Sequence, residues 1–322
     1  MKKIKLLIAA LFAAVSFTPL SVTAQQDPIG SGLSISPTRT DLVVNEGTSA
    51  DLDISVKNVT GGNIIAKAFI NDFEPDGVSG EPRLITDSNV KSASSIKDFI
   101  VGLEDISLGV DETKEVKMQI DIPVGASPGA YYGVIRYQAV PVDDQGQVTE
   151  GGQVALTASV GTIVLVEVPG NIKQQIEIKS LSAYLDDKKG SLFTQKPTHV
   201  GIEIDNKGNG FARPFGKIYI KDMFGKEVLS YEMNNTNPRG VVLPESTRVF
   251  KDPVEGISKP GRYTIYADVS YGNGGEVYSV SSTFWYVPSW LIITGLVVLL
   301  VIVGLAVFLY RKYVTKSLKR RR

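Results

Sequence analysis

The side chains that most often carry out catalysis are rare in this chain or lack their usual partners. His199 is the only histidine in 322 residues, and there is no cysteine. A Ser-His-Asp triad needs a histidine together with a nucleophile held in a strained turn. Zinc sites built on thiolates and thiol nucleophiles both require cysteine. We therefore predict that the chain is not an enzyme and that it has no catalytic residue, no metal site and no cofactor.

Carboxylates are the remaining candidates for chemistry. Glycoside cleavage uses two carboxylates at a set distance in space, which a sequence does not give, and an enzyme acting on carbohydrate is the least favoured of our hypotheses. The run Asp205 to Gly210 resembles a calcium loop in its Asp, Asn and Gly content. Lys207 stands at its third position, where a ligand oxygen belongs, so we interpret the run as a plain turn.

Two features are candidates for binding. Arg136 lies in the middle of a predicted strand over 131–139, on the face opposite Tyr131, and a solvated sheet face is the alternative interpretation. The run 73–105 is long and rich in Asp, Glu, Ser, Lys and Gly. It is either a binding loop or a connection without a function, and we expect its central part, 77–94, to be dispensable for folding.

The elements that would position these residues are β-strands. Polar and apolar residues alternate in many short runs, which predicts antiparallel sheets with one solvated face. Turn signals rich in Gly, Asn and Asp separate them, for example at 61–63, 143–146, 186–190 and 206–210. The clearest strand patterns cover 51–56, 115–122, 175–178, 200–205 and 217–222.

An internal repeat predicts the number of domains. Asn58 and Asn206 each end an alternating run before a Gly-rich turn, and Pro-Gly-x-Tyr follows in each copy, ending at Tyr131 and Tyr263. A tyrosine that bonds back to such a corner is typical of immunoglobulin-like sandwiches. We predict an all-β fold of two immunoglobulin-like β-sandwich domains in tandem, covering residues 27–170 and 171–287.

The two ends of the chain predict a membrane topology. Residues 290–310 carry no charge and include fifteen Leu, Ile, Val or Phe, which is enough for one transmembrane α-helix. Residues 311–322 form a basic tail with seven Lys or Arg and no acid, which the positive-inside rule places in the cytoplasm. Residues 1–24 have the basic start, apolar run and small residues of an N-terminal signal peptide, with an uncleaved anchor as the alternative.

This topology makes the chain a single-pass type I protein of the cell membrane, with most of its residues extracytoplasmic. The helix is expected to contact membrane lipid, and its interfacial anchors are Trp290, Leu291, Phe308, Leu309, Tyr310, Arg311 and Lys312.

The charge and the missing cysteines narrow the class of the exported part. The signal holds three and the tail seven of the 34 Lys and Arg, which leaves 24 cations against 34 acids outside, a net charge of −10. That sign argues against a nucleic-acid partner, because phosphate binding needs a positive face. An exported chain without disulfides indicates a bacterial envelope, and some 260 residues are enough to build a stable core.

The chain resembles the WxL-interacting protein family of Gram-positive-type cell surfaces. The local matches are Leu33 to Pro37, Val56 to Asn58, Gly133 to Tyr137, and Lys259 to Thr264. The resemblance implies a signal peptide, two β-sandwich domains, one C-terminal helix and a basic tail. It also implies that the first domain binds peptidoglycan and the second binds a cell-surface protein.

We therefore expect a non-enzymatic, membrane-anchored cell-envelope protein that presents two domains for adhesion or scaffolding. Recognition would use sheet faces, loops or an exposed edge strand. The alternative is a structural or assembly subunit of an envelope complex.

Overall fold

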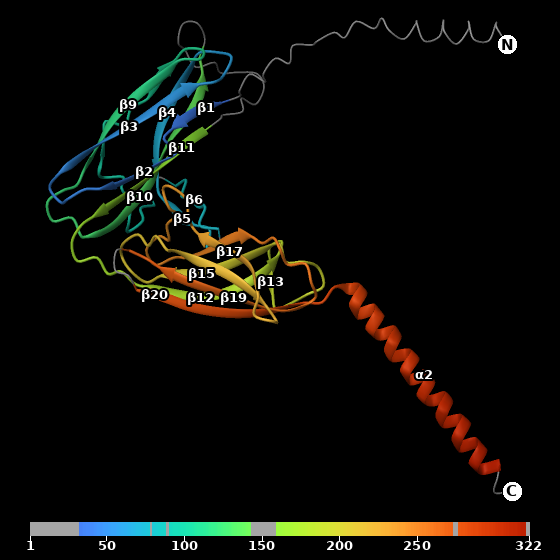
Figure 1. The fold of residues 1–322 in the computed structure, drawn as a ribbon. Coiled ribbons are helices and arrows are strands. Elements are labelled where there is room, and N and C mark those ends of the chain that lie inside the picture. The colour runs from blue at the N-terminus through green and yellow to red at the C-terminus, as the bar shows by residue number, and fades with distance from the viewer. Residues whose placement is uncertain (1–31, 78, 88–89, 143–158, 273–275, 320–322) are drawn as a thin grey trace, which may run out of the picture.

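The computed structural model describes residues 32–319 except for 78, 88–89, 143–158 and 273–275, with side chains as far as residue 312. The predicted signal peptide and the predicted turn at 143–146 lie outside the described residues. Within them the chain is built from β-strands and ends in one apolar helix, α2 (Ser289–Lys319) (Figure 1). The prediction of an all-β chain with a C-terminal helix is confirmed.

The strands near the N-terminus form a sandwich of two sheets. The four-stranded sheet has the order β1 (Leu33–Ser36), β3 (Ser49–Asn58), β9 (Thr113–Asp121) and β7 (Ile100–Val101). The five-stranded sheet has the order β2 (Arg39–Val43), β11 (Ser159–Val168), β10 (Gly129–Pro141), β4 (Ile64–Asn71) and β8 (Ile106–Leu108). We call this pair of sheets sandwich one. Leu52, Met118 and Tyr137 belong to the single core between them.

The strands that follow form a second sandwich with its own core. One sheet has the order β13 (Lys188–Gly190), β12 (Ile176–Leu185), β15 (His199–Asn206) and β18 (Thr247–Pro253). The other has the order β14 (Leu192–Phe193), β20 (Val277–Tyr286), β19 (Gly261–Ser270), β16 (Phe215–Asp222) and β17 (Glu227–Met233). We call this second pair of sheets sandwich two. Ile202, Ile218 and Phe284 are fully buried between them.

Period-two alternation explains why these segments form strands. In β9, the side chains of Val116, Met118 and Ile120 are buried, whereas the residues between them are exposed. A strand with one apolar face is stable only when that face is covered by a second sheet. The predicted strand patterns fall within β3, β9, β12, β15 and β16, apart from one residue at the ends of two of them.

The internal repeat seen in the sequence is also a repeat of hydrogen bonds. The Asn58 side chain donates to Gly62 O at 2.8 Å and accepts from Thr60 N. Asn206 does the same with residues at the same offsets, donating to Gly210 O at 2.8 Å and accepting from Gly208 N. Each buried amide thus ties the end of a strand to the turn that follows it.

Both predicted tyrosine corners are present. The hydroxyl of Tyr131 donates to Ser127 O at 3.0 Å, and that of Tyr263 donates to Lys259 O at 2.6 Å. In each case the acceptor lies four residues upstream, across the Pro-Gly corner. The prediction that these tyrosines bond back to the corner is confirmed.

The run 73–105 is packed against sandwich one, with Ile96 in the core between its sheets and Phe73 against Tyr132 on the outer face of β10. It contains the hairpin β5 (Phe73–Pro75) and β6 (Pro82–Leu84), and it supplies the edge strand β7. Ile96 is fully buried, and Ser94 O accepts a bond from Tyr132 N on β10. Buried Asp72 accepts a bond from Ser92 N. These contacts argue against the expectation that residues 77–94 are dispensable for folding.

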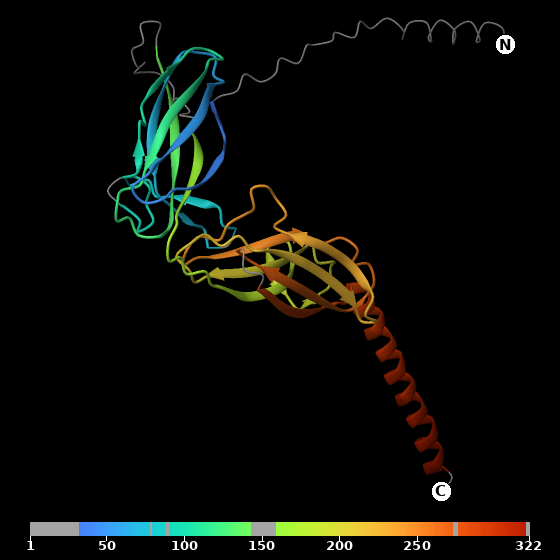
Figure 2. The same cartoon turned by 60° about the vertical axis from the view of Figure 1, so that its left-hand side comes forward.

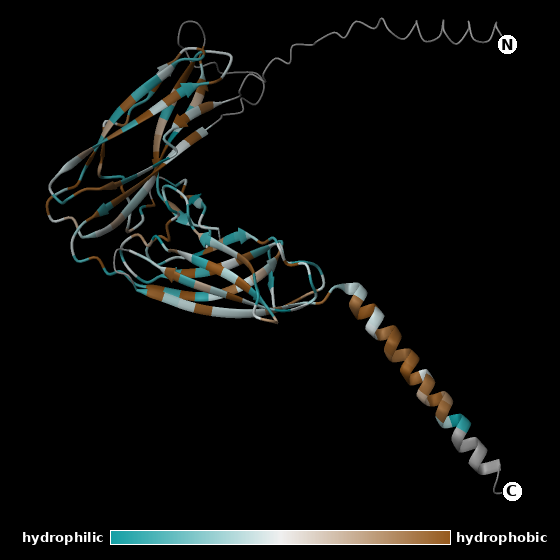
Figure 3. Cartoon of the chain, in the orientation of Figure 1, coloured by the Kyte–Doolittle hydropathy of each residue, from teal (hydrophilic) through white to brown (hydrophobic). Residues whose placement is uncertain are grey.

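The side chains of α2 that the structure describes, from Ser289 to Lys312, are all exposed. Residues Ser289–Lys312 are long and apolar enough to cross a membrane, and none of their most apolar stretch is buried. Figure 3 shows a mostly apolar helix, interrupted by a few pale bands and hydrophilic near its end, that leaves the end of sandwich two. The side chains from Trp290 to Tyr310 that we predicted as anchors are exposed along it.

Replacing Asn206 tests the repeat. Asn206→Ala leaves Gly210 O, Val242 O and Gly208 N without their partner in a buried setting, and we expect the free energy of unfolding to fall by about 3 kcal/mol. Urea unfolding of the full chain in detergent measures it. Asn235→Ala, which removes an asparagine side chain at an exposed position, should change little. Equal effects of the two substitutions would contradict the role given to Asn206.

Candidate functional site

The side chains that the sequence singled out do not come together. Arg136 lies on the outer face of β10, as predicted, where its guanidinium stacks on Phe69 at 4.8 Å and donates to Asn71 and Ser159. His199 lies in sandwich two, with Nδ1 3.0 Å from Thr198 Oγ1. No group of three or more His, Cys, Asp or Glu side chains positioned for a metal occurs among the described residues.

One motif escaped the sequence interpretation. Residues 125–129 have the spacing G-x-S-x-G, which marks a nucleophile when the serine sits between a strand and a helix. Ser127 instead lies between the strands β9 and β10, and its carbonyl accepts the tyrosine corner bond of Tyr131. His199 belongs to the other sandwich. The motif is therefore part of a structural corner.

Polar groups from both sandwiches converge on a cleft where the two sandwiches meet. Its volume is about 370 Å³. Figures 1 and 2 show the sandwiches meeting at a bend, with the β5–β6 hairpin on its inner side. Sandwich one contributes β2, β11 and the hairpin, and sandwich two contributes the 236–243 segment and β18. The lining side chains that matter below are Arg39, Leu165, Leu243, Thr247 and Arg248.

The floor of this cleft is a small apolar core that spans both sandwiches. Tyr132 and Leu165 come from the outer face of sandwich one, and Phe211, Val241 and Leu243 come from sandwich two; all are nearly buried. The rings of Tyr132 and Phe211 lie 6.3 Å apart. Burial of this shared surface is a non-directional attraction that holds the sandwiches in contact.

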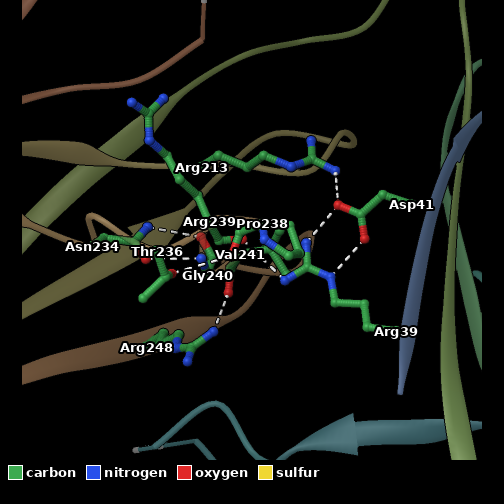
Figure 4. Close-up of polar contacts among 10 residues, drawn as sticks. All are labelled: Arg39, Asp41, Arg213, Asn234, Thr236, Pro238, Arg239, Gly240, Val241 and Arg248. Atoms are coloured by element: carbon green, nitrogen blue, oxygen red, sulfur yellow. Dashed lines mark hydrogen bonds and ion pairs between the residues drawn. The ribbon is translucent and has the colours of Figure 1, made fainter. Parts of the chain in front are cut away.

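A cluster of charged side chains fixes the orientation of the two sandwiches relative to each other. Asp41 on β2 accepts two hydrogen bonds from Arg39, at 2.6 and 2.5 Å, and a third from Arg213 of sandwich two at 3.0 Å. Arg39 also donates to Arg239 O at 3.0 Å (Figure 4). A bidentate arginine fork fixes geometry as well as adding energy.

Burial alone would raise the pKa of Asp41. The hydrogen bonds and positive charges of Arg39 and Arg213 outweigh burial and hold that pKa below its ordinary value of 3.8. Asp41 is therefore ionised at neutral pH, and it carries the negative charge between two arginines.

The backbone of the corner is also tied across the junction. Asn209 N δ2 donates to Pro128 O at 3.1 Å, and Ala130 N donates to Asn209 O at 2.9 Å. Both partners in sandwich one belong to its Pro-Gly corner. The corner thus serves the fold of sandwich one and its attachment to sandwich two.

Arg248 is the least neutralised cation in the cleft. Its Nη1 donates to Val241 O at 2.9 Å and its guanidinium stacks on Phe250, while Nε is buried without a hydrogen-bond partner. Burial lowers the pKa of Arg248 from its ordinary value, the Arg39 guanidinium lowers it further, and Asp76 opposes both. An anionic group entering the cleft would reduce the repulsion between these two arginines.

The hairpin from sandwich one packs directly on Arg248. A Cβ at Gly80, where φ is +73°, would come within 2.5 Å of the Arg248 Cδ. Glycine is therefore required there both for the backbone conformation and for the close approach. The opposite wall is fixed by Asn234, whose side chain donates to Gly240 O at 2.9 Å and accepts from Gly240 N at 2.8 Å (Figure 4).

Strand β18 borders the cleft and is an edge strand. Asn206 N donates to Ser246 O and Val254 N donates to Thr198 O, so the even-numbered residues of β18 bond to β15. By alternation, the backbone groups of Thr247, Val249 and Lys251 point away from the sheet. The matching strand of sandwich one, β9, has its outer edge covered by β7, whereas β18 is the last strand of its sheet.

The sequence interpretation missed all the charged residues of this site. Arg39 and Asp41 stand two positions apart in a short alternating run, so they share one strand face, and that pattern was the available signal. Arg213 and Arg248 gave no local signal, because they are 174 and 209 positions from Arg39. Their meeting depends on how the two sandwiches pack.

The geometry therefore defines a chain of β-strands with one membrane-type helix and a basic cleft beside an open strand edge.

No family model matches the chain, and no curated protein matches it in sequence. Similar solved structures include the class 5 fimbriae chaperone CfaA, at 15% identity over 80% of this chain and 100% of that chain, with a TM-score of 0.39.

The E. coli chaperone DraB is 13% identical over 79% of this chain and 95% of that chain, with a TM-score of 0.36. The Pseudomonas aeruginosa chaperone CupB2 is 11% identical over 78% and 100%, with a TM-score of 0.35. TM-scores this far below 0.5 do not bear on what this chain binds.

Asp41→Asn should loosen the junction. The substitution removes the charge shared by Arg39 and Arg213, and hydrogen bonds to charged groups contribute about 2 kcal/mol. We expect a lower free energy of unfolding and a broader distribution of distances between the sandwiches, measured with one spin label in each. Asp53→Asn, at an exposed position on β3, is the matched control.

The stability that Asp41 contributes should decrease as the pH falls. Because the folded pKa of Asp41 is depressed, the contribution of its charge to the free energy of unfolding is complete above the ordinary pKa of 3.8 and is lost as pH falls through the folded pKa. The difference between the native chain and Asp41→Asn should be constant from pH 7 to pH 5 and vanish in stronger acid. A difference that persists unchanged in stronger acid would contradict this role of Asp41.

Proposed function

We propose that the chain is an exported, non-enzymatic cell-envelope protein, anchored by α2, that captures an extended segment of a protein partner at the junction cleft. In this proposal the two sandwiches are immunoglobulin-like domains, 27–170 and 171–287, held outside a bacterial membrane. Residues 1–24 direct export, and 311–322 remain in the cytoplasm.

The observation that carries the proposal is the open edge of β18 beside the cleft. An unpaired edge offers a row of N–H and C=O groups to which an extended segment can add as a further strand. Stable proteins usually cover such edges, and in sandwich one β7 does so. The same edge left open in sandwich two, next to a cavity with an apolar floor, has the form of a binding site.

The charges of the cleft indicate the chemistry of the segment. Arg39 and Arg248 line the cavity, and Arg248 lacks a partner for Nε. Glu81, which also lines the cavity, offsets part of this charge. An extended segment carrying a carboxylate, with apolar side chains directed at Leu165 and Leu243, would satisfy both the arginines and the floor.

The resemblance to WxL-interacting proteins adds to the proposal a separate binding role for each domain. It assigns peptidoglycan to the first domain and a surface-protein partner to the second. The open edge supports the second assignment, because β18 belongs to sandwich two. Arg136 remains a low-ranking candidate for the first, because its guanidinium is already engaged by Phe69, Asn71 and Ser159.

The alternative function, an assembly subunit of an envelope complex, uses the same observation. An open edge can pair with a neighbouring subunit as well as with a transient partner. Isolation of the protein from the cell surface distinguishes the two. A complex of fixed stoichiometry favours assembly, and one exchangeable partner favours adhesion or scaffolding.

Val249→Pro tests the edge. The outward N–H of Val249 is lost, but proline is tolerated at such positions of edge strands, so the chain should fold with an unchanged Tm. Partner adducts formed in cells by a photo-crosslinking residue at position 251 should disappear. Val249→Thr keeps the N–H and a similar shape, and it should retain the adducts. Adducts that survive in Val249→Pro would exclude strand addition at β18.

Protease treatment of intact, wall-stripped cells tests the topology. We expect the exported part to be digested while α2 and the tail are protected by the membrane, as measured by mass spectrometry of the surviving fragment. Protection of the residues beyond Ala24 together with digestion of the arginine-rich end would show that the orientation is reversed.

A further inference from the structure

The end of sandwich two from which α2 leaves carries an exposed apolar turn. Phe224 is 85% exposed and Met223 is 56% exposed, at the tip of the turn between β16 and β17. Single exposed apolar residues are common on protein surfaces. Two adjacent ones at a turn, where polar and glycine residues are usual, call for a physical explanation.

Strand register places this turn beside the start of the helix. Asp222 at the end of β16 is paired with Tyr263, and Gly261, two residues before Tyr263, is paired with Tyr286 of β20. The turn beyond Asp222 therefore reaches the level of Gly261 and Tyr286, three residues before α2 begins. A Cβ at Gly261 would lie 3.1 Å from the Met223 sulfur, which confirms that the turn lies against this position.

The turn is held in a fixed shape. The carboxylate of Asp222 accepts hydrogen bonds from Phe224 N and Lys226 N, each at 2.9 Å, and Gly225 N donates to Asp222 O. The local structure therefore presents Phe224 outward and does not let it fold back onto the sheet. Exposed Lys226 and Lys259 stand close in sequence to the turn and to the corner beside it.

The opposite side of the same sheet end is also apolar. Leu192 of β14 is 65% exposed and pairs with Trp285 of β20, which is 46% exposed. Trp290, 60% exposed, lies in the first turn of α2. The helix start is thus flanked by exposed apolar side chains on both sides.

We propose that the Met223–Phe224 turn inserts into the outer interface of the same lipid bilayer that α2 spans. The inference rests on the proposed membrane crossing of α2 and adds a second point of attachment. Aromatic and apolar side chains next to a transmembrane helix favour the interfacial region of a bilayer, and flanking lysines reach the headgroups. Two contacts at one end of sandwich two fix its tilt and hold the cleft at a set height above the membrane.

The absence of cysteine makes a direct test available, because one introduced cysteine takes a dye uniquely. The full chain is reconstituted in vesicles of phosphatidylcholine and phosphatidylglycerol, with a polarity-sensitive dye at Phe224→Cys, Val124→Cys or Val298→Cys. Val124, 86% exposed in sandwich one, is the matched control, and Val298 reports on α2. Nitroxide-labelled lipids serve as quenchers.

We expect shallow nitroxides to quench the dye at 224 several-fold more than at 124, and deep nitroxides to quench the dye at 298. Quenching at 298 with equal, low quenching at 224 and 124 overturns the insertion while the membrane helix stands. Absence of quenching at 298 overturns the membrane crossing, and the insertion with it.

A second set of variants removes the influence of the dye on insertion. The dye is placed at Lys226→Cys, and position 224 is either the native Phe or Ser. We expect Phe224→Ser to reduce quenching at 226 and shift the emission toward that of an aqueous dye. Val277→Ser, at the opposite end of β20, is the control and should leave both unchanged. Equal quenching with Phe and Ser at 224 would overturn the proposal.

Discussion

Asp41 accepts hydrogen bonds from an arginine of its own strand and from an arginine of the other sandwich, directly above an apolar core that both sandwiches share. The arrangement of the two halves depends on this combination. The apolar contact supplies attraction without direction, and the ionised carboxylate between Arg39 and Arg213 selects one orientation. The cleft, its two arginines and the position of β18 within it all follow from that orientation.

The two sandwiches are built on one plan and differ at their edges. Buried Asn58 and Asn206 close the same turn, Tyr131 and Tyr263 close the same corner, and the five-stranded sheets have the same order. The run 73–105 supplies β7 to the edge of sandwich one and the β5–β6 hairpin to the junction. Among the described strands, sandwich two has no such addition at β18, so the same framework ends in a closed edge in one copy and an open edge in the other.

α2 and the end of sandwich two from which it leaves constrain how the open edge of β18 can meet a partner. α2 begins three residues after β20, so no long linker separates sandwich two from the proposed membrane. The bend at the junction then directs sandwich one away from the axis of sandwich two (Figures 1 and 2). Under the proposed function, a cleft held this way would receive an extended segment that lies along the cell surface.

The sequence by itself determined the class of the strands, the repeat and the membrane-type helix. These features rest on short-range physics: period two places alternate side chains on one face, Pro-Gly sets a corner that Tyr131 and Tyr263 close, and an uncharged run of sufficient length needs no distant partner. Only the tertiary structure decided the candidate binding site. Arg213 and Arg248 lie 174 and 209 positions from Arg39 in the chain, and no local pattern specifies that they meet Arg39 and Asp41. The role of 73–105 was likewise decided by packing, because composition alone does not distinguish a free loop from a segment that buries Ile96 and Asp72.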